Sequence, residues 1–150
     1  MTRQIFASLA LLATLAACGG GGGTGGGYGG PPVTATQPPA SAALSTATLK
    51  GAPGFVNGAQ FTVYVFDADT TANQSTCGSG NGCAGVWPPV TVAAGATLPA
   101  NWTSFTRADG SQQLAYKGRA LYTYVVDKAP GQTNGDGITS FGNLWHIARP

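Results

Sequence analysis

Two heptapeptides with a shared pattern of aromatic and acidic residues decide the fold: Val63-Tyr64-Val65-Phe66-Asp67-Ala68-Asp69 and Leu121-Tyr122-Thr123-Tyr124-Val125-Val126-Asp127. The second heptapeptide follows the first at an offset of 58 positions. The same offset, without a gap, places Trp87 on Trp145 and residues 46–49 on residues 104–107. Because one offset joins three separate features, the sequence predicts an internal repeat.

Both heptapeptides have the composition of β-strands, since residues 61–66 and 121–126 are rich in β-branched and aromatic side chains. Asp109-Gly110 predicts a tight hairpin turn, and Lys117-Gly118 a second turn. No segment after residue 45 has sustained helical periodicity. We therefore predict an all-β fold over residues 46–150, a small antiparallel domain of two similar repeats packed together. The repeats span about 46–90 and 104–150, and neither could readily bury a core alone.

The N-terminus is typical of an export signal. An apolar run over residues 5–17 follows Arg3, and as a helix it would reach about 20 Å, too short for a bilayer core of ~30 Å. The run ends in Leu15-Ala16-Ala17-Cys18, which resembles the lipobox of bacterial lipoproteins. We predict a signal peptide over residues 1–17 and lipid, such as palmitate, on Cys18. The alternative is an ordinary secretory signal with a chance cysteine.

Residues 18–45 are rich in glycine and proline and predict a disordered tether between the lipid and the domain. We expect cell-envelope localisation, with the membrane as a partner through the lipid anchor. Gly19 follows the anchor where an aspartate would signal inner-membrane retention, which favours the outer membrane in a Gram-negative host. Lipidation of Cys18 would leave Cys77 and Cys83 as a pair, which an oxidising compartment would join in a disulfide.

The charge composition argues against nucleic acid as a partner. Charged residues make up 8% of the chain, with seven Lys and Arg against five Asp and no Glu. Phosphate binding draws on clustered basic residues, and this near-neutral balance supplies no such cluster.

Tyr64-x-Phe66-x-x-Asp69 and Tyr122-x-Tyr124-x-x-Asp127 resemble the repeated Tyr-x-aromatic-x-x-Asp motif of predicted lipoproteins called the secreted repeat of unknown function. Segments around Trp87 and Trp145 support the resemblance, which covers almost all of residues 46–150. It implies an exported, usually lipid-anchored domain with tandem repeats and no settled activity. Family members tend to have a tighter cysteine pair than the one in this chain.

The motif residues allow two interpretations. Alternate strand residues share a face, so Tyr64 with Phe66 and Tyr122 with Tyr124 could present aromatic pairs to a ligand. The simpler interpretation is that these rings are core. The aspartates that end the two motifs would then cap the turns after their strands.

His146 is the one histidine of the chain, so any histidine-dependent catalysis or metal binding would have to use it. We expect no metal and no cofactor, and no catalytic constellation, so the chain is predicted not to be an enzyme. The first hypothesis is a non-catalytic binding or structural module for an envelope protein or small ligand. The alternative is an accessory role in envelope redox or in metal or haem handling through His146 and the aromatic faces. An enzyme acting on glycan through paired aspartates is a third hypothesis.

Overall fold

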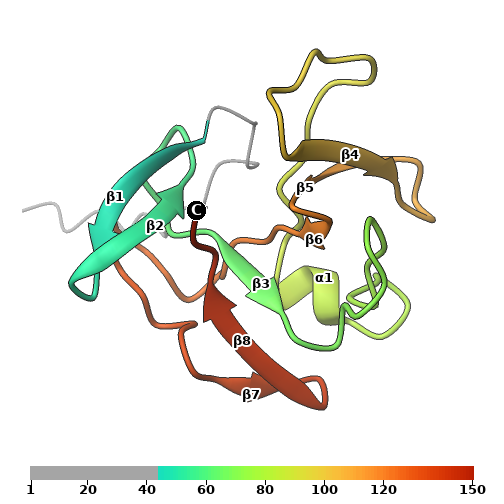
Figure 1. Ribbon diagram of the computed structural model, residues 1–150. Helices are drawn as coiled ribbons and strands as arrows, with labels where there is room; N and C mark the ends of the chain where they lie inside the picture. Colours follow the sequence, from blue (N-terminus) through green and yellow to red (C-terminus); the bar gives the residue numbers. More distant parts are fainter. Residues whose placement is uncertain (1–43) are drawn as a thin grey trace, which may run out of the picture. The chain divides into compact units, whose positions relative to one another are not determined.

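The computed structural model describes residues 44–150 (Figure 1). The predicted signal peptide, Cys18 and the predicted tether up to residue 43 lie outside the described residues. The first strand begins at Ser45, where the tether was expected to end. None of the helices in the described part is long and apolar enough to cross a membrane.

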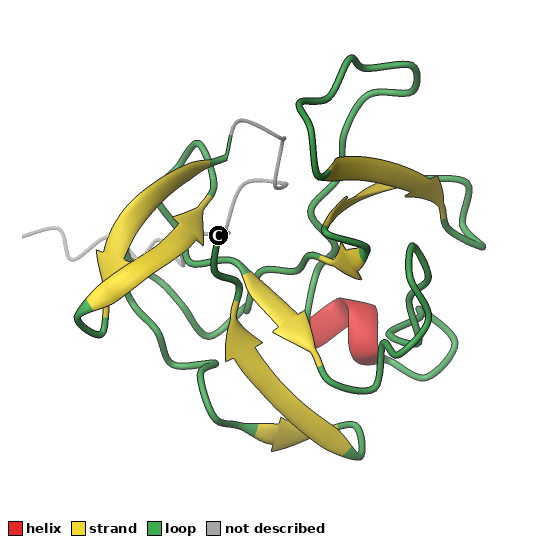
Figure 2. Ribbon diagram, viewed as in Figure 1, coloured by secondary structure: helices red, strands yellow, loops and turns green. Residues whose placement is uncertain are grey.

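The described residues form three antiparallel sheets, with strand orders β1-β2, β3-β8-β7 and β4-β5-β6 (Figure 2). The predicted all-β fold is confirmed, and α1 in the same region is a single helical turn. The elements in chain order are β1 (Ser45–Leu49), β2 (Ala52–Val56), β3 (Tyr64–Phe66), α1 (Cys83–Val86), β4 (Trp102–Thr106), β5 (Gln112–Tyr116), β6 (Arg119–Ala120), β7 (Thr139–Ser140) and β8 (Asn143–Ile147).

The β1–β2 hairpin of the first repeat corresponds to the β4–β5 hairpin of the second. Thr46 pairs with Phe55 in β1–β2, and Ser104 pairs with Leu114 in β4–β5. Thr46 and Ser104 are also related by the offset of 58 positions. Their partners Phe55 and Leu114 are 59 positions apart, so the strand pairing repeats with one extra residue in the second hairpin.

Both predicted turns are present. Lys117 and Gly118 have φ of 48° and 79° and join β5 to β6 in a two-residue turn. Asp109-Gly110 lies in the turn between β4 and β5, where the Arg107 N–H donates to the Ser111 carbonyl at 2.9 Å and the Gly110 N–H donates to the Arg107 carbonyl at 3.0 Å. The Asp109 carboxylate accepts hydrogen bonds from the backbone and the hydroxyl of Ser111. The tight hairpin turn predicted here is therefore confirmed, with three residues, 108–110, in its loop.

Tyr64 and Tyr122, which occupy the same position in the two repeats, pair with each other. The Tyr64 backbone N–H donates to the Tyr122 carbonyl at 2.8 Å, and the reverse bond is 3.0 Å long. The bridge is antiparallel. An antiparallel pair has a local two-fold axis between its members, so the two repeats meet about a pseudo-two-fold axis here.

The tryptophan segment of each repeat pairs with the tyrosine strand of the other repeat. β3 pairs with β8, placing Tyr64 opposite Ile147 and Phe66 opposite Trp145 (Figure 1). Tyr122 bridges Pro89, the position equivalent to Ile147. The Thr123 N–H donates to the Pro88 carbonyl at 2.9 Å, but Pro88 has no backbone N–H to return the bond, which interrupts the ladder. The continuous strand expected over residues 121–126 is therefore reduced to isolated bridges at Tyr122.

The core alternates with the strand period of two. Tyr64, Phe66 and Tyr122 belong to one buried cluster, which also contains both core tryptophans and the two disulfide cysteines. Val63 and Leu121, one position earlier in each repeat, belong to a second buried cluster. Alternate residues of a strand face opposite sides, so each motif strand separates the two clusters.

Candidate functional site

Four of the motif aromatic rings form one stack that crosses between the repeats. Trp87 and Trp145 lie parallel in the middle, with ring centroids 3.8 Å apart and an interplanar angle of 1°. Phe66 stacks on Trp145 at 4.1 Å, and Tyr124 stacks on Trp87 at 4.0 Å. The outer ring of each pair comes from the opposite repeat, so the stack obeys the same pseudo-two-fold relation as the backbone.

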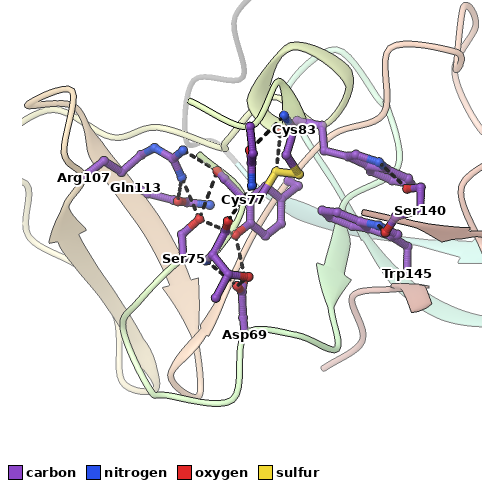
Figure 3. Close-up of a disulfide and its surroundings, with 12 residues drawn as sticks. Asp69, Ser75, Cys77, Cys83, Arg107, Gln113, Ser140 and Trp145 are labelled. Carbon is purple, nitrogen blue, oxygen red and sulfur yellow. Dashed lines mark hydrogen bonds between the residues drawn. A yellow bond between two sulfur atoms is a disulfide. The ribbon is translucent and has the colours of Figure 1, made fainter. Parts of the chain in front are cut away.

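Ser140 holds both indole groups of the stack (Figure 3). The Trp87 Nε1–H donates to Ser140 Oγ at 3.0 Å, and the Trp145 Nε1–H donates to the Ser140 carbonyl at 3.3 Å. Gly135 makes room beside the stack, because a Cβ there would lie 2.8 Å from a Trp87 ring atom and 2.9 Å from a Tyr64 ring atom. The indoles are fully buried, and both of their polar atoms are satisfied.

The motif tyrosines and aspartates bind each other reciprocally across the axis. The Tyr64 hydroxyl donates to Asp127 Oδ2 at 2.7 Å, and the Tyr122 hydroxyl donates to Asp69 Oδ2 at 2.5 Å. These contacts join residues 63 and 53 positions apart. We call the two pairs the interlock, because each repeat supplies the tyrosine for one pair and the aspartate for the other.

Each aspartate of the interlock also closes the loop that follows it. Asp69 Oδ1 accepts from the backbone N–H and the hydroxyl of Thr76, at 2.7 and 2.8 Å. Asp127 Oδ1 accepts from the backbone and side-chain N–H groups of Asn134, both at 3.0 Å. These bonds correspond to the capping role predicted for the aspartates. In addition, each aspartate accepts a hydrogen bond from the tyrosine of the other repeat.

Burial governs the protonation of the interlock. Burial, followed by the hydrogen bond and the charge of Asp127, raises the pKa of Tyr64 far above its usual range. Burial and the charge of Asp69 do the same to the pKa of Tyr122. Burial also raises the pKa of Asp127, against the lowering effect of its hydrogen bonds. Both hydroxyls therefore stay protonated at physiological pH and act as hydrogen-bond donors.

Arg107 builds a polar cluster on one side of the interlock, with its side chain only 5% exposed. Its guanidinium donates to Ser75 Oγ at 3.0 Å, to the Cys77 carbonyl at 2.6 Å and to Gln113 Oε1 (Figure 3). Ser75 Oγ also lies 2.7 Å from the Tyr122 hydroxyl. Arg107 thereby ties the β4–β5 hairpin to the interlock and to the disulfide loop.

The Arg107 cluster exists in only one repeat, because Leu49 occupies the equivalent position in the other. Arg107 was not predicted as a site residue from the sequence. The sequence feature that could have identified Arg107 is its charge, because the equivalent position in the other repeat is apolar. The Arg107 Nε has no hydrogen-bond partner among the described residues and lies 3.7 Å from the Asp109 carboxylate.

The predicted disulfide between Cys77 and Cys83 is present and fully buried (Figure 3). It closes a loop of glycine and polar residues that leads into α1. The Trp87 backbone N–H, at the end of α1, donates to the Cys83 carbonyl at 2.8 Å. The disulfide thus holds the start of the segment that delivers Trp87 to the aromatic stack.

His146 lies apart from the interlock. It follows Trp145 in β8, and strand alternation turns its side chain to the other face, where it is 46% exposed. Its Nε2 lies 3.0 Å from Asp67 Oδ2, while Asp67 Oδ1 accepts from Arg119 at 2.9 Å. The hydrogen bond from Arg119, aided by the neighbouring His146, lowers the pKa of Asp67. Within residues 44–150, no group of three or more His, Cys, Asp or Glu side chains is arranged to hold a metal.

Within residues 44–150, the site residues predicted from the sequence therefore fall into three places, while Cys18 lies outside the described residues. The eight motif residues meet in the interlock and the aromatic stack, the cysteines form the disulfide, and His146 lies on the surface. The motif residues are Tyr64, Phe66, Asp69, Trp87, Tyr122, Tyr124, Asp127 and Trp145.

Comparison with known proteins agrees with this duplicated architecture. A family model described as a secreted repeat of unknown function matches the chain twice, over residues 47–91 and 103–149. A search of curated proteins and a search of solved structures each found no match. The two matched segments together cover more than half of the chain and contain both Tyr-x-aromatic-x-x-Asp motifs. The chain therefore belongs to the family described as the secreted repeat of unknown function.

Proposed function

We propose that this protein is a lipid-anchored component of the cell envelope whose two-repeat β-domain is a non-catalytic binding or structural module. The observation that carries the proposed non-catalytic role is the reciprocal interlock. The motif tyrosines and aspartates that could have formed a reactive site bind one another across the pseudo-two-fold axis.

The environment of the interlock supports a structural role for its members. Tyr64 and Tyr122 are completely buried, and Asp127 is 1% exposed. A general acid or base must reach a substrate proton and needs a pKa near the working pH. The raised pKa of both tyrosines and the hydrogen bonds on both carboxylates favour a role in holding the repeats together.

The proposed anchor rests on the sequence alone. A charged residue, a short apolar run and Leu15-Ala16-Ala17-Cys18 stand in the order that lipoprotein processing requires. The family is described as secreted, which agrees with export of the chain. In a Gram-negative host, Gly19 favours the outer membrane as the anchored location.

Metabolic labelling with an alkyne fatty acid tests the anchor. We expect the wild-type chain to incorporate label and to fractionate with membranes, and Cys18→Ser to abolish the labelling. The matched control is the double variant Cys77→Ser and Cys83→Ser, which removes the other cysteines and should keep the label. An unlabelled wild-type chain, or equal labelling of Cys18→Ser, would refute the anchor.

The alternative, a role in envelope redox or in metal or haem handling, gains no supporting contact among the described residues and stays a hypothesis. His146 hydrogen-bonds Asp67, which is itself paired with Arg119. Titration of the folded chain with Zn²⁺, Cu²⁺ and haem tests it. Stoichiometric binding that His146→Ala abolishes would establish it.

A further inference from the structure

A recess of about 450 Å³ opens between β8 and the turn that joins β5 to β6. Its lining includes four apolar side chains, from Val65, Leu121, Ile147 and Ala148. All four are buried, with exposed fractions between 0% and 9%. Protein atoms cover most of these four side chains, so they form the floor of the hollow and expose little apolar area to it, and the volume of the hollow falls in the range of small-molecule sites.

Positive charge surrounds this hollow. Lys117, Arg119 and Arg149 line it together with His146. Lys117 Nζ lies 5.0 Å from the Tyr116 ring centre, and Arg119 is fixed by Asp67 at 2.9 Å and by the Phe66 carbonyl at 3.1 Å.

Asp136 also lines the hollow, Asp67 contacts Arg119 in its wall, and both carboxylates already have cationic partners. Asp67 pairs with Arg119, and Asp136 pairs with Lys50 at 2.9 Å. Lys117 makes no ion pair with any residue in the described range 44–150. An incoming anion would therefore meet an unneutralised lysine beside an oriented guanidinium.

The charged set occurs once, although the fold is duplicated. The positions equivalent to Arg119, His146 and Arg149 in the first repeat are Phe61, Pro88 and Thr91. The interlock and the aromatic stack recur in both halves, whereas the Arg107 cluster, the disulfide and these charges each occur in one. Exposed ion pairs contribute little to stability. Stability gained from ion pairs therefore does not account for the charges gathered around this hollow.

We propose that this hollow binds a small amphipathic anion, with an acidic head at Lys117 and Arg119 and a short apolar body over the buried floor. This inference rests on the proposed role as a non-catalytic binding module and names its ligand class. A free molecule fits better than a lipid headgroup in a bilayer, because the apolar floor is recessed and a flat membrane surface would not reach it.

Calorimetric titration with decanoate tests the proposal. The protein is the chain from residue 18 onward carrying Cys18→Ser, so that no lipid is attached. Anilinonaphthalene sulfonate serves as a fluorescent competitor, and decanol is the neutral analogue. We expect saturable, one-to-one binding of decanoate, displacement of the dye, and much weaker binding of decanol.

Two matched variants locate the site. Lys117→Asn removes the unpaired charge and keeps a residue that tolerates the left-handed backbone at φ 48°. Lys128→Asn removes one charge from an exposed loop residue that does not line the hollow. We expect Kd for decanoate to rise about tenfold in the first variant, as for loss of a charge-assisted hydrogen bond, and to change less than about twofold in the second.

Three outcomes would overturn the inference: no saturable binding of decanoate, equal weakening by the two lysine variants, or decanol binding as tightly as decanoate. Vesicles of phosphatidylglycerol form a further arm. Lys117-dependent binding to them without decanoate binding would assign the charge to the membrane and also refute a small-molecule site. Fatty-acid labelling at Cys18 is measured separately, so failure of the hollow and failure of the anchor are distinguishable.

Discussion

Replacing Tyr64 by phenylalanine removes one hydroxyl from the interlock and leaves the ring in place. In the native domain this hydroxyl donates to Asp127 Oδ2 at 2.7 Å and accepts from the Gly135 backbone N–H at 3.3 Å. Asp127 would keep its bonds from Asn134 but lose its only partner from the first repeat among the described residues. The variant therefore isolates the polar link between the repeats.

The expected cost follows from the burial of this link. A hydrogen bond to a charged group contributes about 1.5–3 kcal/mol to stability. Because the Asp127 carboxylate stays buried in the variant, we expect the loss of stability to lie near the middle of that range. We expect Tyr64→Phe to lower the free energy of unfolding by about 2 kcal/mol. For a domain of about this size, that corresponds to a fall in Tm of roughly 8 °C.

Urea unfolding followed by tryptophan fluorescence measures the effect. Tyr116→Phe is the matched control, since Tyr116 is half-buried and contributes ring contacts to Phe55 and Trp102. We expect the control to stay within about 0.5 kcal/mol of wild type, as is usual for substitutions that touch no buried network. In a double-mutant cycle with Asp127→Asn, the coupling energy should reach about 1–2 kcal/mol. Equal effects of Tyr64→Phe and Tyr116→Phe, or a coupling energy near zero, would refute the interlock as a stabilising link.

Three further predictions concern the disulfide, the aromatic stack and the pH dependence of stability. Replacing Cys77 and Cys83 by serine should lower the free energy of unfolding by about 2 kcal/mol through loop entropy. Equal free energies of unfolding for this variant and for the wild-type chain, both without reductant, would contradict the prediction. Gly135→Ala should cost about 1–3 kcal/mol, because the new Cβ would lie within 2.9 Å of two aromatic rings, whereas Gly85→Ala meets open space and should be neutral in the same urea assay. The pKa of Asp127 is raised in the folded state. The contribution of Asp127 to the free energy of unfolding is therefore fully present below its unfolded-state pKa of about 3.8 and is lost as the pH rises through its folded-state pKa. The difference in stability between wild type and Asp127→Asn should therefore favour wild type more at pH 4 than at pH 7, and a difference that is constant with pH would rule this out.

Local patterns predicted much of the fold. Alternation in the two motif strands predicted that Tyr64 and Phe66 share a face, and both lie in the same buried cluster. The offset between repeats predicted the correspondence of the two hairpins, and Asp109-Gly110 and Lys117-Gly118 predicted the two turns. These features depend on residues close together in the chain, where strand geometry and turn chemistry act directly.

One prediction failed for an identifiable local reason. The strand expected at residues 121–126 pairs only through isolated bridges, because Pro88 accepts a hydrogen bond from Thr123 and has no N–H to return it. One residue thus altered the backbone pairing without changing the hydrophobic pattern.

By itself, the sequence determined that the domain is all-β and duplicated, that its motif strands have two distinct faces, and that Cys77 pairs with Cys83. Only the tertiary structure decided that each motif tyrosine binds the aspartate of the other repeat. The hydrophobic period sets which side of a strand is buried, but it carries no information about which distant segment covers that side. That choice depends on packing between segments more than 50 positions apart, where Trp87 and Trp145 stack on the pseudo-two-fold axis and bring the two halves into register.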